Sequence, residues 1–227
     1  MAPPPEQDRM MQVMAWLEIH QARLIAALVV IILGVSVLLV WRNVRADRES
    51  KANAALLALR ARPGVSETAP RAADYLRVAD QYPSSMAGRR AQLLAAGAFF
   101  EAGQYSEALS EFEKAGERQR SGSLAAQAAY GVAASLDALD RIDDAVARYQ
   151  AVIVEYAGDS VAGQARLALA RIHASRGQPE IALRLYDEVL RDRDAGAFAQ
   201  QAMQQRESLI RSHPQLAGNG APVDSVP

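Results

Sequence analysis

The chain of 227 residues carries 25 lysines and arginines against 26 acidic residues, so its formal net charge is −1. This balance excludes the strong basic excess that a nucleic-acid-binding protein shows. The sequence contains no cysteine, which excludes disulfides, thiolate metal ligands, thiol nucleophiles and a lipid-modified cysteine.

Residues 1–23 are predicted to form a leader. Residues 1–9, MAPPPEQDR, combine three prolines with polar side chains, a composition typical of disorder. From Met10 to Arg23 the apolar residues cluster toward one side of a helical wheel. This pattern favours a helix that lies in a membrane interface before the chain turns into the bilayer.

Residues 24–41, LIAALVVIILGVSVLLVW, form an uncharged apolar run between Arg23 and Arg42. A helix of this length is about 27 Å long, close to the thickness of the hydrocarbon core of a bilayer. A cleaved signal normally has a shorter apolar core that is followed at once by a small-x-small site. Here the nearest such motif is residues 52–54, beyond a charged stretch. The run therefore favours a retained transmembrane helix over a cleaved signal or a buried core helix.

Beyond this run the sequence predicts an all-α protein. It is rich in alanine, leucine, arginine and glutamate, and its apolar residues recur at three- and four-residue spacing. A linking helix is expected at 42–62, a repeat domain at 63–213, and a disordered tail at 214–227. Breaks containing glycine, proline or serine divide the repeat domain into helices of about 12–18 residues, and the short turns between them force antiparallel hairpins.

An interval of 37 residues relates three segments of the repeat domain. Each segment has an alanine followed four positions later by an aromatic residue, and the pairs are Ala108 and Phe112, Ala145 and Tyr149, and Ala182 and Tyr186. The alanine lets the two helices of a hairpin approach closely, and the aromatic ring fills the wedge between neighbouring hairpins. Tyr75 marks a degenerate copy one interval earlier.

The turns inside the hairpins keep the same interval. Gly103 and Gly177 stand where such a turn needs a positive φ, and Asp140 takes this place in the middle copy.

The small residue, the aromatic residue and the turn glycine in register resemble the tetratricopeptide repeat, although each copy is longer than the usual 34 residues. The resemblance implies an α-solenoid of about three to four helical hairpins, because each hairpin buries its apolar face only by stacking on the next. A capping helix is expected to follow, with the apolar residues Phe198, Met203, Leu209 and Ile210.

Residues suited to catalysis are sparse. The three histidines, His20, His173 and His213, form no metal-binding spacing, and His173 is expected to pack in the core. Exposed helix surfaces account for the acidic residues without an acid–base role. The sequence therefore predicts a protein that is not an enzyme, with no cofactor, no metal ion and no small-molecule substrate.

The solenoid instead offers a concave groove for a protein or peptide segment. By repeat register, the first helices of the hairpins are expected to present seven residues there: Arg90, Phe100, Glu101, Tyr130, Asp137, Gln164 and Arg171. Their mixed chemistry lacks the basic clamp that some repeats use for acidic C-terminal tails, so an unfolded or partner segment is the expected ligand.

The short leader, the span ending in Trp41-Arg42, the linking helix and the divergent repeats together resemble the YfgM-like ancillary subunits of the bacterial SecYEG translocon. The resemblance implies a single-pass protein of the bacterial inner membrane with a cytoplasmic N-terminus and periplasmic repeats. It further implies association with translocon subunits and with a membrane-anchored chaperone, so that newly translocated proteins reach folding factors.

The charges beside the span indicate the opposite orientation. Arg9 and Arg23 precede the span, whereas five basic residues follow it: Arg42, Arg45, Arg48, Lys51 and Arg60. The flank richer in lysine and arginine usually stays in the cytoplasm, although long domains are translocated largely regardless of this bias. The charge bias therefore leaves a cytoplasm-facing repeat receptor open. A scaffold for envelope assembly or cell division, in which the span and the flanking helix drive assembly, is a further alternative.

Overall fold

The structure is a computed structural model that describes residues 6–60, 71–119, 121–192 and 195–218. Within these ranges every regular element is a helix, which confirms the predicted all-α class. The chain divides into two compact units, Met1–Lys51 and Ala52–Pro227.

Helix α1 runs without a break from Glu6 to Arg60. The leader prediction is therefore wrong for residues 6–9, which are helical, and residues 1–5 lie outside the described part. The expected turn between an interfacial helix and the span is also absent, because residues 10–41 belong to this one helix.

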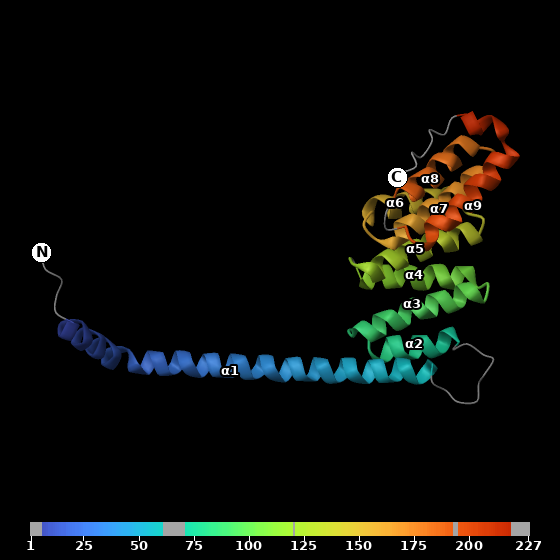
Figure 1. The fold of residues 1–227 in the computed structure, drawn as a ribbon. Coiled ribbons are helices and arrows are strands. Elements are labelled where there is room, and N and C mark those ends of the chain that lie inside the picture. Colours follow the sequence, from blue (N-terminus) through green and yellow to red (C-terminus); the bar gives the residue numbers. More distant parts are fainter. Residues whose placement is uncertain (1–5, 61–70, 120, 193–194, 219–227) are drawn as a thin grey trace, which may run out of the picture. The chain divides into compact units, whose positions relative to one another are not determined.

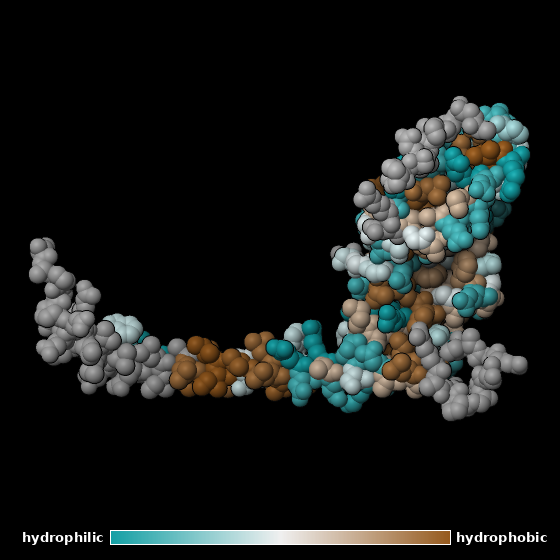
Figure 2. All heavy atoms as spheres, in the orientation of Figure 1, coloured by the Kyte–Doolittle hydropathy of each residue, from teal (hydrophilic) through white to brown (hydrophobic). Residues whose placement is uncertain are grey.

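The described part of α1 exposes an apolar surface from Leu28 to Trp41. Large apolar side chains in this stretch are about half exposed or more, such as Val30 at 68% and Val37 at 69%. Figure 2 shows them as a brown band that gives way to teal side chains further along the helix. This helix is long and apolar enough to cross a membrane, and none of its apolar window is buried. Among the described residues no other element covers these side chains, so this stretch is not part of a core in the structure.

In the described part of the repeat unit, eight α-helices follow α1 and stack in chain order (Figure 1). They are α2 Ala72–Gln81, α3 Met86–Glu101, α4 Tyr105–Arg118, α5 Ser123–Ala138, α6 Ile142–Glu155, α7 Ser160–Ser175, α8 Pro179–Arg191 and α9 Ala197–Ser212. Each packs against the next along the chain, and α3, α5, α7 and α9 also pack against one another in that order. These four helices begin at positions separated by the same 37-residue interval, so α9 continues the repeat register while it caps the array.

The interval reflects one packing arrangement that is used repeatedly. Ala108, Ala145 and Ala182 are each 0% exposed. The ring of Phe112 on α4 packs closely on Gly131 of α5, since a Cβ added to Gly131 would lie only 2.4 Å from this ring. The aromatic ring therefore occupies the wedge between hairpins, as predicted.

The three turns inside the hairpins have one geometry. Gly103, Asp140 and Gly177 have φ of 74°, 60° and 69°. In each turn the following residue donates its backbone N–H to the carbonyl five positions earlier, at 2.9 Å. This pairing is the Schellman motif, which requires a left-handed residue, and it confirms the predicted positive φ at all three positions.

Asp140→Gly is expected to raise the free energy of unfolding by about 0.5–1 kcal/mol. An aspartate is strained at positive φ, whereas glycine adopts it readily. The side chain of Asp140 is exposed, so its removal costs little packing. Urea unfolding of the full chain in detergent micelles measures the change, and an unchanged or lower midpoint would contradict this account of the turn.

The two ends of the repeat unit differ from the expectation. Ala52 and Leu56, from the expected linking helix, are buried, and Leu56 clusters with Tyr75 and Val78 of α2. After α9, residues Pro214–Gly218 form a 3-10 helix whose Leu216 is 2% exposed. The predicted disorder of 214–227 is therefore wrong for 214–218, and 219–227 lie outside the described residues.

The expected capping helix is present as α9. Leu209 is buried, and Phe198 and Ile210 pack against the same cluster. Met203, expected among its apolar contacts, is instead 49% exposed.

Candidate functional site

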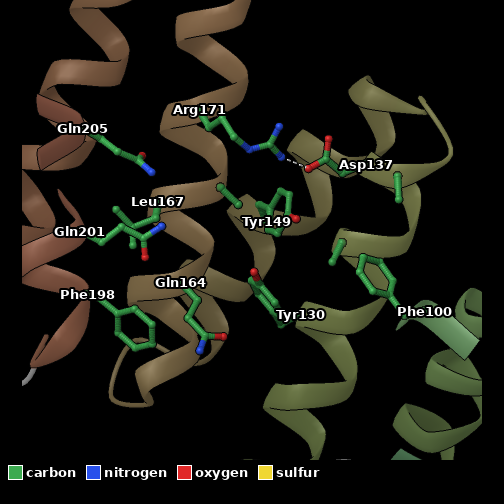
Figure 3. A pocket seen from close by; sticks show the side chains of 13 residues that line it. Phe100, Tyr130, Asp137, Tyr149, Gln164, Leu167, Arg171, Phe198, Gln201 and Gln205 are labelled. Atoms are coloured by element: carbon green, nitrogen blue, oxygen red, sulfur yellow. Dashed lines mark hydrogen bonds and ion pairs between the residues drawn. The ribbon is translucent and has the colours of Figure 1, made fainter. Parts of the chain in front are cut away.

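A groove of about 670 Å³, here called the inner groove, lies along α3, α5, α7 and α9 (Figure 3). It contains five of the seven residues expected from the sequence: Phe100, Tyr130, Asp137, Gln164 and Arg171. The other lining residues are Ala134, Ala138, Tyr149, Leu167, Ala168, Phe198, Gln201 and Gln205.

Arg90 and Glu101 do not line the inner groove. Both lie on α3, which reaches the groove only through Phe100 near its C-terminal end. Arg90 precedes Phe100 by almost three helical turns, and Glu101 is rotated from it by about 100° around the helix axis. Both side chains are exposed.

Two tyrosines form the floor of the inner groove. Tyr149 of α6 is 1% exposed, and its ring centroid lies 5.7 Å from that of Tyr130 on α5. Burial raises the pKa of the Tyr149 hydroxyl above its ordinary value, and the nearby Tyr130 and Asp137 raise it further. Burial also raises the pKa of Tyr130, which the charge of Arg171 partly opposes. Both rings therefore stay neutral at physiological pH.

One ion pair crosses the floor. The guanidinium of Arg171 on α7 donates to the carboxylate of Asp137 on α5, so the pair joins two neighbouring hairpins. The side chain of Asp137 is 12% exposed and that of Arg171 is 58% exposed. The carboxylate is thus neutralised within the groove, while part of the guanidinium stays available to a ligand.

Three glutamines supply uncharged donors and acceptors: Gln164 from α7, and Gln201 and Gln205 from α9. The Oε1 atom of Gln205 is buried and accepts no hydrogen bond within the described structure. The exposed amide of Gln201 and the half-buried amide of Gln164 can hydrogen-bond the backbone of a bound segment. Amides, aromatic rings and a neutralised ion pair suit an uncharged peptide backbone with apolar side chains.

The contribution of α9 was not predicted, although the sequence contains a signal for it. Gln201 follows Gln164 by one 37-residue interval, so extending the repeat register into the capping helix would have found it. Tyr149 was assigned only to packing between hairpins, but its ring serves both the core and the groove.

His173 does not pack in the core as expected. Its ring is partly exposed at the end of α7, where Nδ1 lies 2.6 Å from Oε1 of Gln178 in the following turn. Among the described residues, no group of three histidine or acidic side chains could hold a metal ion.

Stability is expected to fall as the pH rises above about 10, because Tyr149 has a raised pKa in the folded state. The unfolded tyrosine loses its proton near pH 10 while the folded one keeps it, so ionisation favours unfolding. This group adds a slope of up to about 1.4 kcal/mol per pH unit. Urea unfolding at about pH 9 and about pH 11 measures the slope, and Tyr149→Phe should make it shallower; an equal slope in both chains would contradict the assignment.

The stacked hairpins and the groove along their first helices define an α-solenoid of helical-hairpin repeats. The chain belongs to the family described as tetratricopeptide repeat-like domain, whose family model matches residues 14–152. The matched range includes the apolar part of α1 as well as the hairpins up to α6. The search of curated proteins found no match to this chain. Domains of this family are protein-interaction scaffolds.

Proposed function

We propose that this protein is a membrane-anchored interaction module whose inner groove binds a segment of a partner protein. The observation that carries the proposal is the inner groove itself, in which Tyr130 and Phe198 face uncharged amides and the unpaired Oε1 of Gln205. Such a surface can hydrogen-bond a backbone of any sequence and hold apolar side chains.

Anchoring rests on α1. The uncharged run at 24–41 and its exposed apolar side chains need a hydrocarbon environment. The nearest motif that a signal peptidase could cut, residues 52–54, lies inside α1, and Ala52 is buried. This placement favours a retained single span over a removed signal.

We further propose that the repeats work in the periplasm as an accessory of the Sec translocon. The resemblance in layout to the YfgM-like subunits supports this role, and the family match, which covers the span and the repeats as far as α6, is consistent with it. In this role, translocon subunits and a membrane-anchored chaperone are the partners, and newly translocated chains are the clients.

A cytoplasm-facing receptor is the second candidate, and the basic flank favours it. Arg42, Arg45 and Arg48 follow the span directly, and the guanidinium of Arg45 lies 3.6 Å from the ring centroid of Trp41. A flank of this kind usually remains on the cytoplasmic side.

Fusion of alkaline phosphatase or of a fluorescent protein after residue 227 separates the two candidates. In a Gram-negative host the periplasmic role predicts phosphatase activity and no cytoplasmic fluorescence. Fluorescence without phosphatase activity would reject the translocon role and select the cytoplasmic receptor.

A further inference from the structure

A second groove, of about 660 Å³, lies between α4, α5 and α6. It is called the outer groove, and its floor includes Ala125, Ala129 and Val132 of α5. These residues lie about 140° around α5 from Tyr130, Ala134 and Asp137, which line the inner groove. The two grooves therefore use different faces of one helix.

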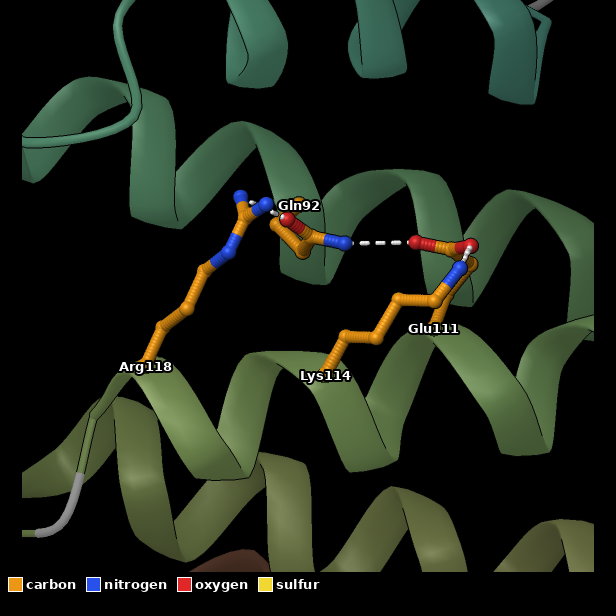
Figure 4. Close-up of polar contacts among 4 residues, drawn as sticks. All are labelled: Gln92, Glu111, Lys114 and Arg118. Carbon is orange, nitrogen blue, oxygen red and sulfur yellow. Dashed lines mark hydrogen bonds and ion pairs between the residues drawn. The ribbon is translucent and has the colours of Figure 1, made fainter.

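In the preceding hairpin the position equivalent to Ala129 is filled. Gln92 of α3 stands one 37-residue interval earlier and is 2% exposed. Its Nε2 donates to the Glu111 carboxylate, and its Oε1 accepts from Arg118 (Figure 4). Lys114 completes the network by donating to Glu111 at 2.6 Å. A long polar side chain from α3 is thus held by α4.

In the following hairpin the equivalent position is also filled. Arg166 of α7 stands one interval after Ala129, and its side chain is 17% exposed. It pairs with Glu188 of α8 at 3.5 Å and with Asp192 at 3.9 Å. Here the chain itself supplies a cationic side chain to an acidic site.

The middle hairpin lacks the cationic side chain of this site and one of its two acidic side chains. Alanines occupy positions 129 and 151, which correspond to Arg166 and Glu188, whereas Glu155 keeps an acidic group at the position of Asp192. The outer groove is the space that these two small residues leave. The middle hairpin thus keeps one of the two acidic groups, at Glu155, and lacks the internal cation.

The charge of the outer groove matches this interpretation. The described lining residues include the carboxylates of Glu113, Glu117 and Glu155 and one guanidinium, that of Arg148. All four side chains are exposed, and none takes part in an ion pair within the described structure. Their sum is negative, and Val132 and Val152 add an apolar floor that suits the aliphatic stem of a basic side chain.

We propose that the outer groove binds a segment of a partner protein that carries an arginine or a lysine. The cationic side chain lies beside Ala129, in the position that the side chain of Arg166 occupies in the next hairpin. The apolar stem packs on the α5 floor and the charged end meets Glu117 and Glu155. This site is independent of the inner groove, so either can fail without the other.

The test uses the full chain in nonionic detergent micelles and a fluorescent synthetic peptide of alanine, leucine and arginine. Matched peptides carry glutamate or citrulline in place of arginine. The arginine peptide is expected to bind, more weakly as salt is added, and the citrulline and glutamate peptides are expected to bind at least about tenfold more weakly. Fluorescence polarisation measures each Kd.

Two substitutions locate the binding. Ala129→Arg places in the groove the side chain that the next hairpin already carries, and is expected to weaken peptide binding about tenfold or more. Glu155→Gln removes an exposed carboxylate, which also hydrogen-bonds the side chain of Tyr156, and is expected to weaken peptide binding about three- to tenfold. Gln127→Arg is the charge-matched control, because Gln127 is exposed on the same helix and lines neither groove.

The proposal is overturned if the arginine and glutamate peptides bind alike, or if none binds at about 1 mM. It is equally overturned if Ala129→Arg and Gln127→Arg have the same effect while circular dichroism shows both folded. A loss of self-association on Ala129→Arg, seen by sedimentation of the chain alone, would assign the groove to a second copy and reject a separate partner. Gln201→Ala, which alters the inner groove without changing its charge, should leave binding of the arginine peptide to the outer groove unaffected.

Discussion

Tyr149→Ala is expected to lower the free energy of unfolding by about 3–5 kcal/mol, the usual cost of removing a large buried aromatic side chain. Tyr149 is among the largest fully buried side chains of the described structure. It belongs to one core cluster with Ala133 of α5 and Leu169 of α7, so this cluster joins three consecutive helices. Truncation leaves a cavity at the centre of the array, where neighbouring hairpins cannot close without disturbing the repeat geometry.

Tyr149→Phe is the matched control for this substitution. It keeps the ring and removes only the hydroxyl group, so its cost is expected to be about 1 kcal/mol. Urea unfolding of the full chain in detergent micelles, followed by circular dichroism, compares the two. Equal midpoints for Tyr149→Ala and Tyr149→Phe would show that the ring does not support the fold as described.

Gly88→Ala is expected to cost about 3 kcal/mol although alanine favours helices. A Cβ at Gly88 would lie 1.9 Å from the carbonyl oxygen of Tyr82. This oxygen accepts from the backbone N–H of Ser85 at 3.1 Å and from its hydroxyl at 2.9 Å. The backbone of the turn must therefore move, and these hydrogen bonds are lost with it.

Gly97→Ala in the same helix separates this steric effect from helix propensity. No atom lies within 4 Å of a Cβ at Gly97, so the substitution is expected to stabilise the protein by about 0.5–1 kcal/mol. The two glycines should thus respond with opposite signs. If both substitutions raise the unfolding midpoint, the close approach of α3 to the preceding turn is wrong.

The repeat unit was predictable because its determinants recur locally. Ala108 allows two helices to approach closely, Phe112 fills the space between hairpins, and Gly103 forms the turn. Because these residue types recur every 37 residues, they indicate that the hairpins stack in the same way. Five groove residues followed from the same register, since equivalent positions on α5 and α7 face the same side. Arg90 and Glu101 show the limit of this reasoning, because a register does not say where a groove ends.

Features that depend on tertiary contacts or on missing atoms were not predictable. Residues 214–218 lack the apolar periodicity of the helices and were predicted to be disordered, yet Leu216 is buried in the same cluster as Leu209. The outer groove exists because Ala129 and Ala151 are small, and an alanine in a helix carries no signal of an empty space. The helix before Met10 was missed because composition alone suggested disorder, whereas α1 begins at Glu6.

Site-specific photo-crosslinking tests the central claim, that the inner groove binds a segment of a partner protein, most directly. A photoreactive residue at Gln201 lies in the inner groove, whereas one at Gln150 is exposed on α6 and lines neither groove. In membranes of a Gram-negative host, position 201 is expected to form a crosslinked adduct, whereas position 150 is not. Mass spectrometry is expected to assign the adduct to one segment of a translocon subunit, a membrane-anchored chaperone or a translocated chain. Equal crosslinking at both positions, or none at position 201, would contradict a binding role for this groove.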